Sequence, residues 1–282
     1  MSDTYTSSTH IGSVYLYARQ PASLASFYQH SLGLDLLGEA GDTLLLGVGG
    51  QPLVGIQPAT QAQASGRRTG LFHLALRYAT RLALARAFRR LVTLRTVLQG
   101  ASDHGVSESI YLMDPEGNGI ELYYDRQPEM WPRSADGSLQ LFTTTLDLDQ
   151  LLAEDLAYTS RPHVDPHTRM GHIHLNVADI PASEKFFVEL LGFDVVQRYG
   201  KTALFVSAGG YHHHVAMNTW QGVGASPPPT GTPGLAWFEI DGVNLGEMQR
   251  RLEEAGWDFQ HSPGGGIRTL DPSGIGLILL GE

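Results

Sequence analysis

The sequence predicts an α+β fold built from four βαβββ modules. Two observations predict it: the halves of the 282-residue chain resemble each other, and each quarter shows the same order of patterns. In each quarter, an alternating segment typical of a half-buried strand precedes an amphipathic helical segment, and short strands separated by glycines follow. Repetition of this kind indicates one unit used several times. We therefore expect modules at 10–60, 69–128, 169–222 and 233–282.

Two matched segments carry the repeat. Near the start of the halves, the segments 14–17 and 32–34 (Val-Tyr-Leu-Tyr and Leu-Gly-Leu) recur at a constant offset as Ile-His-Leu-Asn and Leu-Gly-Phe. Near the ends, Leu-Met-Asp-Pro-Glu-Gly-Asn-Gly at 112–119 matches Thr-Leu-Asp-Pro-Ser-Gly-Ile-Gly at 269–276. Proline presets one turn dihedral and glycine relieves the next, so each Asp-Pro-x-Gly predicts a tight turn before the last strand of its module.

The modules group into two domains joined by a linker. We expect an N-terminal domain at 10–128, a linker at 129–168 and a C-terminal domain at 169–282. The amphipathic segments predict four module helices, and the linker carries one further short helix. The expected helices cover residues 22–31, 80–94, 181–190, 245–255 and, in the linker, 146–157.

Composition excludes several classes of protein. With 42% hydrophobic and 17% charged residues, the chain is typical of a well-packed globular protein. Its net charge of −10 argues against nucleic acid or an anionic membrane as a partner. The N-terminus lacks a secretion signal, and no apolar run reaches the roughly 20 residues of a membrane span, so we expect a cytoplasmic protein. Because cysteine is absent, any metal must be held by His, Asp or Glu.

One motif resembles a known family. The run Asp-Pro-Glu-Gly-Asn-Gly-Ile-Glu-Leu at 114–122 resembles the last strand of a vicinal-oxygen-chelate module. This superfamily includes extradiol catechol dioxygenases, glyoxalase I and the fosfomycin- and bleomycin-resistance proteins, and the resemblance covers nearly the whole chain. It implies that paired modules form two cupped mixed sheets. It also implies that metal ligands come from the first and last strands of a module.

The ligand positions of the family are filled in two modules only. The second module offers His73 and Glu121, and the third offers His172, whereas the first and fourth carry Ser13 and Ile278 at matching positions. We therefore infer a metal cup shared by modules two and three, in departure from the family's usual pairing of one with two and three with four, which would separate His172 from His73 and Glu121. Two imidazoles and one carboxylate form the facial triad of non-haem Fe(II) oxygenases, and Mn(II) suits the same ligands. A set in which His10 joins His73 and Glu121 requires modules one and two to pair instead.

Three further residues match the extradiol branch. Tyr111 takes the place of the tyrosine that hydrogen-bonds the catecholate in that branch. His104 lies in a His-Gly-Val-Ser run, which resembles a motif that some extradiol enzymes carry just upstream of this tyrosine. His214 matches the acid–base histidine, although a fourth metal ligand or a structural histidine remain alternatives. Tyr111 could equally be a strand aromatic. Strand alternation predicts that His212 and His214 share one face and that His213 lies on the other.

The resemblance implies an extradiol ring-cleaving dioxygenase. Its partners would be dioxygen and a small aromatic diol of the catechol or hydroquinone type, with Fe(II) as cofactor. One alternative is a glyoxalase-like isomerase or lyase that uses Zn(II) or Ni(II); the other is a metal-free protein that sequesters small molecules. Exposed strand edges between modules often pair in this superfamily, so a homo-oligomer remains an alternative to a monomer.

Overall fold

The described strands form two mixed sheets in a computed structural model that describes residues 5–155 and 163–281. The eight-stranded sheet contains, in hydrogen-bonding order, β15 (Phe259–His261), β16 (Ile267–Leu270), β17 (Gly276–Leu279), β14 (Gly234–Val243), β1 (Tyr5–Ala18), β4 (Gln51–Pro58), β3 (Thr43–Val48) and β2 (Asp35–Ala40). The nine-stranded sheet contains β11 (Asp194–Tyr199), β12 (Ala203–Ser207), β13 (Val215–Asn218), β10 (Arg169–Asn176), β5 (Gly70–Tyr78), β8 (Gly119–Asp125), β7 (Ser107–Met113), β6 (Leu98–Asp103) and β9 (Thr144–Thr145). The predicted α+β class with two mixed sheets is confirmed.

The helices lie where the sequence predicts them, with two differences. They are α1 (Pro21–Phe27), η1 (Tyr28–Leu32), α2 (Arg81–Thr93), η2 (Pro128–Met130), α3 (Leu148–Ala153), α4 (Ile180–Glu184), η3 (Lys185–Leu190) and α5 (Leu245–Glu254). The first difference is that the helices of modules one and three each change to a π-helix, η1 and η3, which amphipathic periodicity does not reveal. The second is that α3 ends at Ala153, before the expected end of the linker helix, part of which lies outside the described residues.

Side-chain caps explain where the helices begin. The side chains of Thr80, Asp147, Asp179 and Asn244 each accept a hydrogen bond from the backbone N–H three residues later. Each cap satisfies one of the N–H groups that the first turn leaves without a helical partner. The starts of α2, α3, α4 and α5 are therefore set by local sequence.

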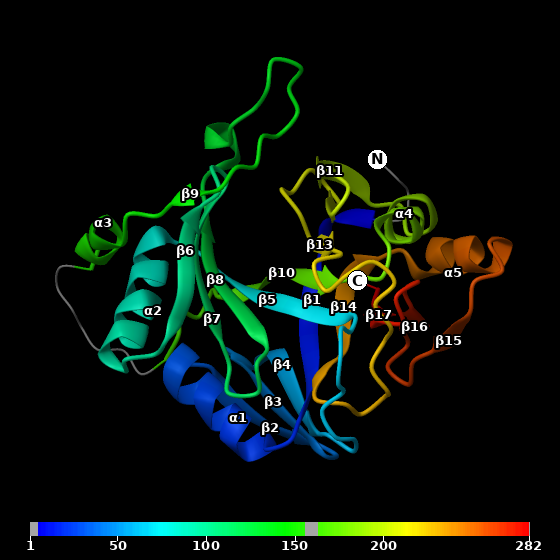
Figure 1. Cartoon of the computed structure of the whole chain (residues 1–282), viewed down its shortest axis with the longest axis horizontal. Coiled ribbons are helices and arrows are strands. Elements are labelled where there is room, and N and C mark those ends of the chain that lie inside the picture. The colour runs from blue at the N-terminus through cyan, green and yellow to red at the C-terminus, as the bar shows by residue number, and fades with distance from the viewer. Residues whose placement is uncertain (1–4, 156–162, 282) are drawn as a thin grey trace. The chain divides into compact units, whose positions relative to one another are not determined.

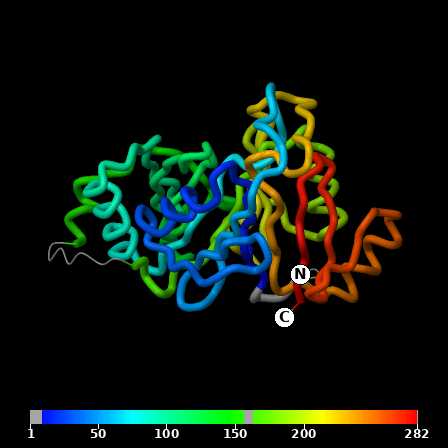
Figure 2. The backbone as a smooth tube through the Cα atoms, turned by 90° about the horizontal axis from the view of Figure 1, so that it is seen from below, coloured from blue at the N-terminus to red at the C-terminus, as the bar shows by residue number. Residues whose placement is uncertain are grey.

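The chain divides into two compact units. Unit 1 contains residues 1–17, 59–72 and 172–282, and unit 2 contains residues 18–58 and 73–171. In unit 1, β14 and β17 pair in parallel, and Figures 1 and 2 show β14, β16 and β17 running side by side. In unit 2, α2 packs on β8, and α1 packs on β3 and β4 (Figure 1). Each unit thus covers strands with helices from the same unit.

Helix α2 shows how unit 2 is held together. Its residues Leu84, Phe88 and Leu91 recur at helical spacing and are fully buried or nearly so, which stabilises unit 2 by roughly 1.5–3 kcal/mol for each side chain. Its polar face also makes specific contacts. Arg90 donates hydrogen bonds to the carbonyl oxygens of Leu32 and His163, at 2.8 and 2.9 Å.

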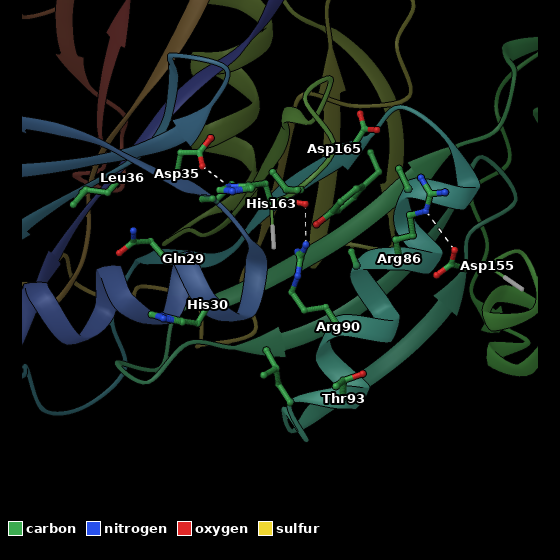
Figure 3. Close-up of a pocket in the computed structure, with 16 residues that line it drawn as sticks. Gln29, His30, Asp35, Leu36, Arg86, Arg90, Thr93, Asp155, His163 and Asp165 are labelled. Carbon is green, nitrogen blue, oxygen red and sulfur yellow. Dashed lines mark hydrogen bonds and ion pairs between the residues drawn. The ribbon is translucent and has the colours of Figure 1, made fainter. Parts of the chain in front are cut away.

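A pocket of about 610 Å³ lies at this polar face of α2 (Figure 3). Arg86 and Asp155 form an ion pair of 3.4 Å at its wall, and Asp35 accepts a hydrogen bond from His163 at 2.7 Å. No candidate metal ligand or catalytic residue of the sequence lines this pocket. The chemistry of the candidate site therefore lies elsewhere.

The two Asp-Pro-x-Gly turns form as predicted. Gly117 and Gly274 have φ of +91° and +76°, in the left-handed region that favours glycine. In the first turn, one carboxylate oxygen of Asp114 accepts hydrogen bonds from the N–H groups of residues 116 and 118. In the second, Asp271 accepts from residues 273 and 275 in the same way. The repeat therefore extends to individual hydrogen bonds.

Asp271 gives the fold a pH dependence that can be measured. Burial raises its pKa to about 7, and its Oδ2 atom has no hydrogen-bond partner among the described residues. Because the folded-state pKa lies above the unfolded value of about 3.9, this group stabilises the fold at low pH, and that stabilisation is lost as pH rises through 7. We expect Asp271→Asn to gain stability relative to the native chain between pH 5 and pH 8, by about 1–3 kcal/mol.

Urea unfolding of the native protein and of the Asp271→Asn variant at several pH values measures this difference in stability. Asp194→Asn serves as a control, since Asp194 is exposed on β11. A difference between Asp271→Asn and the native chain that stays constant or shrinks with rising pH would show that Asp271 ionises normally in the fold.

Candidate metal centre

His73 and Glu121 come together on neighbouring strands of unit 2. Strands β5 and β8 pair in parallel, with Ala75 opposite Glu121 and His73 opposite Gly119. His73 and Ala75 alternate onto the same face of β5, which brings the imidazole next to the carboxylate. The Nε2 atom of His73 lies 3.0 Å from Oε2 of Glu121, and both residues are buried. A buried carboxylate is stable only with a charged or hydrogen-bonding partner.

His172 lies on β10 and is 2% exposed. Two histidines of the 212–214 run lie near its ring in unit 1. The ring of His213 lies 4.2 Å from that of His172, centre to centre, and the ring of His212 lies 6.4 Å away. His172 is therefore part of a cluster of imidazoles.

The predicted ligands form one group. The ligand atoms of His73, Glu121 and His172 all lie within 4.8 Å of one another, and all three residues are buried. Two imidazoles and one carboxylate at this spacing are a donor set that divalent iron, manganese or zinc accepts. The negative charge of the buried carboxylate also favours a cation over an apolar filling. The residues fit a metal ion and could bind one.

Tyr111 and His104 are hydrogen-bonded beside this group. Tyr111 lies opposite Glu121 in the β7–β8 ladder, and its ring centre is 5.8 Å from that of His73. Nδ1 of His104 lies 3.0 Å from the carbonyl oxygen of Phe142, so Nδ1 must donate in that bond. Nε2 of the neutral ring then accepts from the Tyr111 hydroxyl, 2.7 Å away. Burial and the Glu121 carboxylate raise the pKa of Tyr111 well above its usual value, so this hydroxyl keeps its proton at neutral pH.

The loop that presents His104 depends on a glycine. His104 precedes Gly105 between β6 and β7, and Gly105 has a φ of +79°. A Cβ atom at this glycine would lie 2.6 Å from the ring of Phe142, closer than van der Waals contact permits. The His-Gly-Val-Ser run thus has a structural reason for its second residue.

The 212–214 run lies just before β13, which begins at Val215. The burial of the run nevertheless alternates as predicted, because His212 and His214 are buried whereas His213 is partly exposed. The rings of His212 and His214 both pack against Tyr211, and Nδ1 of His214 accepts a hydrogen bond from the Ala208 N–H. The rings of His212 and His213 lie 4.8 Å apart, and their Nδ1 atoms are 2.9 Å apart.

His213 adjoins His172, although the sequence singled out His214. Its ring lies closer to that of His172 than the ring of His212 does. Its position follows from the loop that precedes β13, and no periodicity predicts a loop conformation. The only sequence signal was the histidine run itself, which marks the segment without selecting a member.

His10 stands apart from the metal group. Its Nε2 atom lies 3.3 Å from Oδ2 of Asp241 in unit 1, and its side chain is 44% exposed. The group of ligand atoms around His73 and Glu121 contains His172 and not His10.

Comparisons with known proteins identify the family of the chain. Residues 169–277 match a family model described as the glyoxalase/bleomycin resistance protein/dioxygenase superfamily, and residues 13–123 match a glyoxalase-like domain. A catechol-2,3-dioxygenase of Bacillus subtilis (strain 168) is 36% identical over 273 residues, which cover 94% of each chain.

Solved structures share the fold at low sequence identity. Glyoxalase I of Zea mays superposes with a TM-score of 0.57 at 14% identity, over 96% of this chain and 92% of the other. The cppA protein of Streptococcus pneumoniae TIGR4 superposes with a TM-score of 0.57 at 11% identity, over 98% of both chains. At such identities the likeness concerns the fold alone. Among the described residues, no helix is long and apolar enough to span a membrane.

Proposed function

The chain belongs to the glyoxalase/bleomycin resistance protein/dioxygenase superfamily as a catechol-2,3-dioxygenase-like member, and from this premise we propose that it cleaves the ring of a catechol-type diol next to its hydroxyl groups. We propose Fe(II) as the cofactor, held by His73, Glu121 and His172, with Mn(II) as the other ion that suits these ligands. The observation that carries the proposal is the buried group of two imidazoles and one carboxylate within 4.8 Å.

The ligand set explains why a redox-active ion belongs here. Three protein ligands leave coordination positions for a diol and dioxygen, which is the arrangement of non-haem Fe(II) oxygenases. When bound, Fe(II) supplies activation of dioxygen and lowers the pKa of the diol. Glutamate, the single anionic ligand, neutralises half of the charge of the ion and leaves it attractive to a diol anion.

Tyr111 and His104 act on the substrate in this proposal. Without a diol, the Tyr111 hydroxyl donates its single proton to Nε2 of His104, 2.7 Å away, which holds the hydroxyl in place. When a diol binds, this hydroxyl, which keeps its proton at neutral pH, turns its hydrogen bond from His104 to a diol oxygen. The pair thereby stabilises the negative charge that develops on the diol oxygen.

A histidine of the 212–214 run supplies general acid–base catalysis. His214 matches the family position, and the ring of His213 lies 4.2 Å from that of His172. The geometry favours His213 for proton transfer and His214 for holding the loop through its bond with Ala208. Nδ1 of His213 lies 2.9 Å from Nδ1 of His212, which orients the His213 ring.

Oxygen uptake tests the proposed function. The chain is purified without oxygen, loaded with Fe(II), and mixed with catechol and a panel of substituted catechols and hydroquinones. We expect oxygen consumption together with a yellow ring-opened product. The variant with both His73 and Glu121 replaced by alanine should consume none. Metal-loaded protein that consumes no oxygen with any diol would rule out the proposed function.

A further inference from the structure

The side chain of Arg126 holds the chain on both sides of His104. Arg126 directly follows β8, and its side chain is 20% exposed. Its guanidinium donates one hydrogen bond to each carboxylate oxygen of Asp103 and another to the carbonyl oxygen of Gly105, at 3.1 Å. Asp103 and Gly105 are the two neighbours of His104 in the chain. One arginine therefore fixes the segment that presents this histidine.

The carboxylate of Asp103 also shapes the turn at His104. Its Oδ1 atom accepts a hydrogen bond from the Gly105 N–H at 2.8 Å. Hydrogen bonds from Arg126 lower the pKa of Asp103, so the carboxylate keeps its charge at neutral pH. Two parallel hydrogen bonds between a guanidinium and a carboxylate fix an orientation as well as a distance. The direction in which the segment leaves β6 is thus set by this pair.

A buried glutamate fixes the position of Arg126 in turn. Glu108 is 6% exposed, and its Oε1 atom accepts a hydrogen bond from Arg126 at 2.9 Å. Its Oε2 atom accepts from Arg81, the first residue of α2, at 2.7 Å. Asp103 and Glu108 lie opposite each other in the β6–β7 ladder, where like charges repel. Because Arg126 bonds both carboxylates, it removes a repulsion that would separate the two ends of this loop.

The placement of His104 decides how its ring meets Tyr111. Nδ1 donates to the carbonyl oxygen of Phe142 at 3.0 Å, and Nε2 accepts from the Tyr111 hydroxyl at 2.7 Å. Both bonds depend on where the backbone holds the ring, because a hydrogen bond weakens steeply with distance and angle. A misplacement of about 1 Å near a reaction can lower its rate about a hundredfold. The hold on the His104 backbone therefore matters for the Tyr111 hydroxyl.

We propose that Arg126 is a positioning residue of the ring-cleaving reaction, which acts through His104 on the Tyr111 hydroxyl. This inference rests on the proposed function and adds a residue outside the metal group. Among the described residues, the side-chain hydrogen bonds of Arg126 all go to residues 103–108. Arg126 thus influences the substrate only by keeping Nε2 of His104 directed at Tyr111.

A double-mutant cycle tests whether Arg126 acts through His104. The kcat and KM values for catechol are measured with Fe(II) for the native chain, Arg126→Gln, His104→Ala and the double variant. We expect Arg126→Gln to lower kcat about 10- to 100-fold and to change KM less than about threefold. In the His104→Ala background the same substitution should lower kcat no further. Effects that multiply in the double variant would overturn the proposal.

Arg81→Gln is the matched control for a general loss of stability. Arg81 bonds the same glutamate, Glu108, and its other side-chain bonds go to Gln150 and Glu154 at α3. We expect this variant to lose stability to urea as Arg126→Gln does, and to keep kcat within about twofold of the native value. An equal fall in kcat in both variants would assign the effect to the ion-pair network as a whole and overturn the proposal.

Asp103→Asn repeats the test while Glu108 keeps both of its arginines. Asparagine keeps the shape of the side chain and weakens the bonds from Arg126, so kcat should fall with KM little changed. The His104→Ala background should cancel this fall as well. A native kcat in a folded Asp103→Asn variant would overturn the proposal, whether or not Arg126→Gln folds.

A measurement without iron or diol separates this proposal from the proposed function. Nitrogen-15 NMR of the metal-free protein at about pH 8, where an ordinary histidine is neutral, distinguishes the two tautomers of the ring. The signals of His104 are assigned by their loss in His104→Ala. We expect a single tautomer, protonated at Nδ1, in the native chain and in Arg81→Gln, and a mixture in Arg126→Gln. That change supports the hold of Arg126 on His104 even if no diol is cleaved, and an unchanged single tautomer overturns it even if every diol is cleaved.

Discussion

Replacement of Glu121 by glutamine should remove nearly all metal binding and ring-cleaving activity. Glutamine keeps the shape of the side chain and loses its charge, so the site retains two neutral imidazoles and no anionic ligand. Loss of a hydrogen-bonding partner of a ligand already lowers metal affinity about 10- to 100-fold. Loss of a ligand charge should exceed this, so we expect at least a hundredfold weaker binding of Fe(II). Elemental analysis after anaerobic loading and oxygen uptake with catechol measure the two effects.

A second glutamate provides a matched control. Glu239 is partly buried on β14 and lies outside the metal group. Glu239→Gln should bind one Fe(II) per chain with native affinity, like the unchanged protein. If Glu121→Gln bound iron as tightly as Glu239→Gln does, Glu121 would not be a metal ligand.

His213 and His214 should differ in their effect on turnover. General acid–base catalysis contributes about 10²- to 10⁴-fold to a rate. We expect His213→Gln to lower kcat by a factor in this range while iron still binds, because the His213 ring lies 4.2 Å from the ring of His172, beside the proposed metal ligands. His214→Gln should lower kcat less and reduce stability, because His214 accepts a backbone hydrogen bond at a buried position.

The pH dependence of kcat distinguishes the two roles. If His213 transfers a proton, one limb of the native pH profile should disappear in His213→Gln and persist in His214→Gln. The opposite pattern, in which His214→Gln abolishes that limb and His213→Gln does not, would return the acid–base role to the family position. Urea unfolding of both variants measures the expected loss of stability at His214.

The sequence predicted the fold because its signals repeat. Strand alternation and helix periodicity are local patterns, and four copies of the same order made the modules recognisable. The π-helices were missed because periodicity places a helix without specifying its hydrogen-bond pattern. The first residues of the helices were easier to predict than their hydrogen-bond pattern. N-terminal caps such as Thr80 and Asp179 depend only on residues a few positions apart in the sequence.

The candidate site was predictable where strands position it. His73, Glu121 and His172 lie in strands, where the position within a repeat determines the direction of the side chain. The 212–214 run lies in the loop before β13, so the contacts of its rings could not be predicted from strand position.

The most direct measurement of the central claim is the position of iron in crystals of the protein grown without oxygen and loaded with Fe(II). Anomalous scattering at the iron absorption edge locates the ion without assumptions about its ligands. The proposal predicts one iron per chain, bound by the imidazoles of His73 and His172 and by the carboxylate of Glu121. Iron bound without His172, or at a place other than this group, would contradict it.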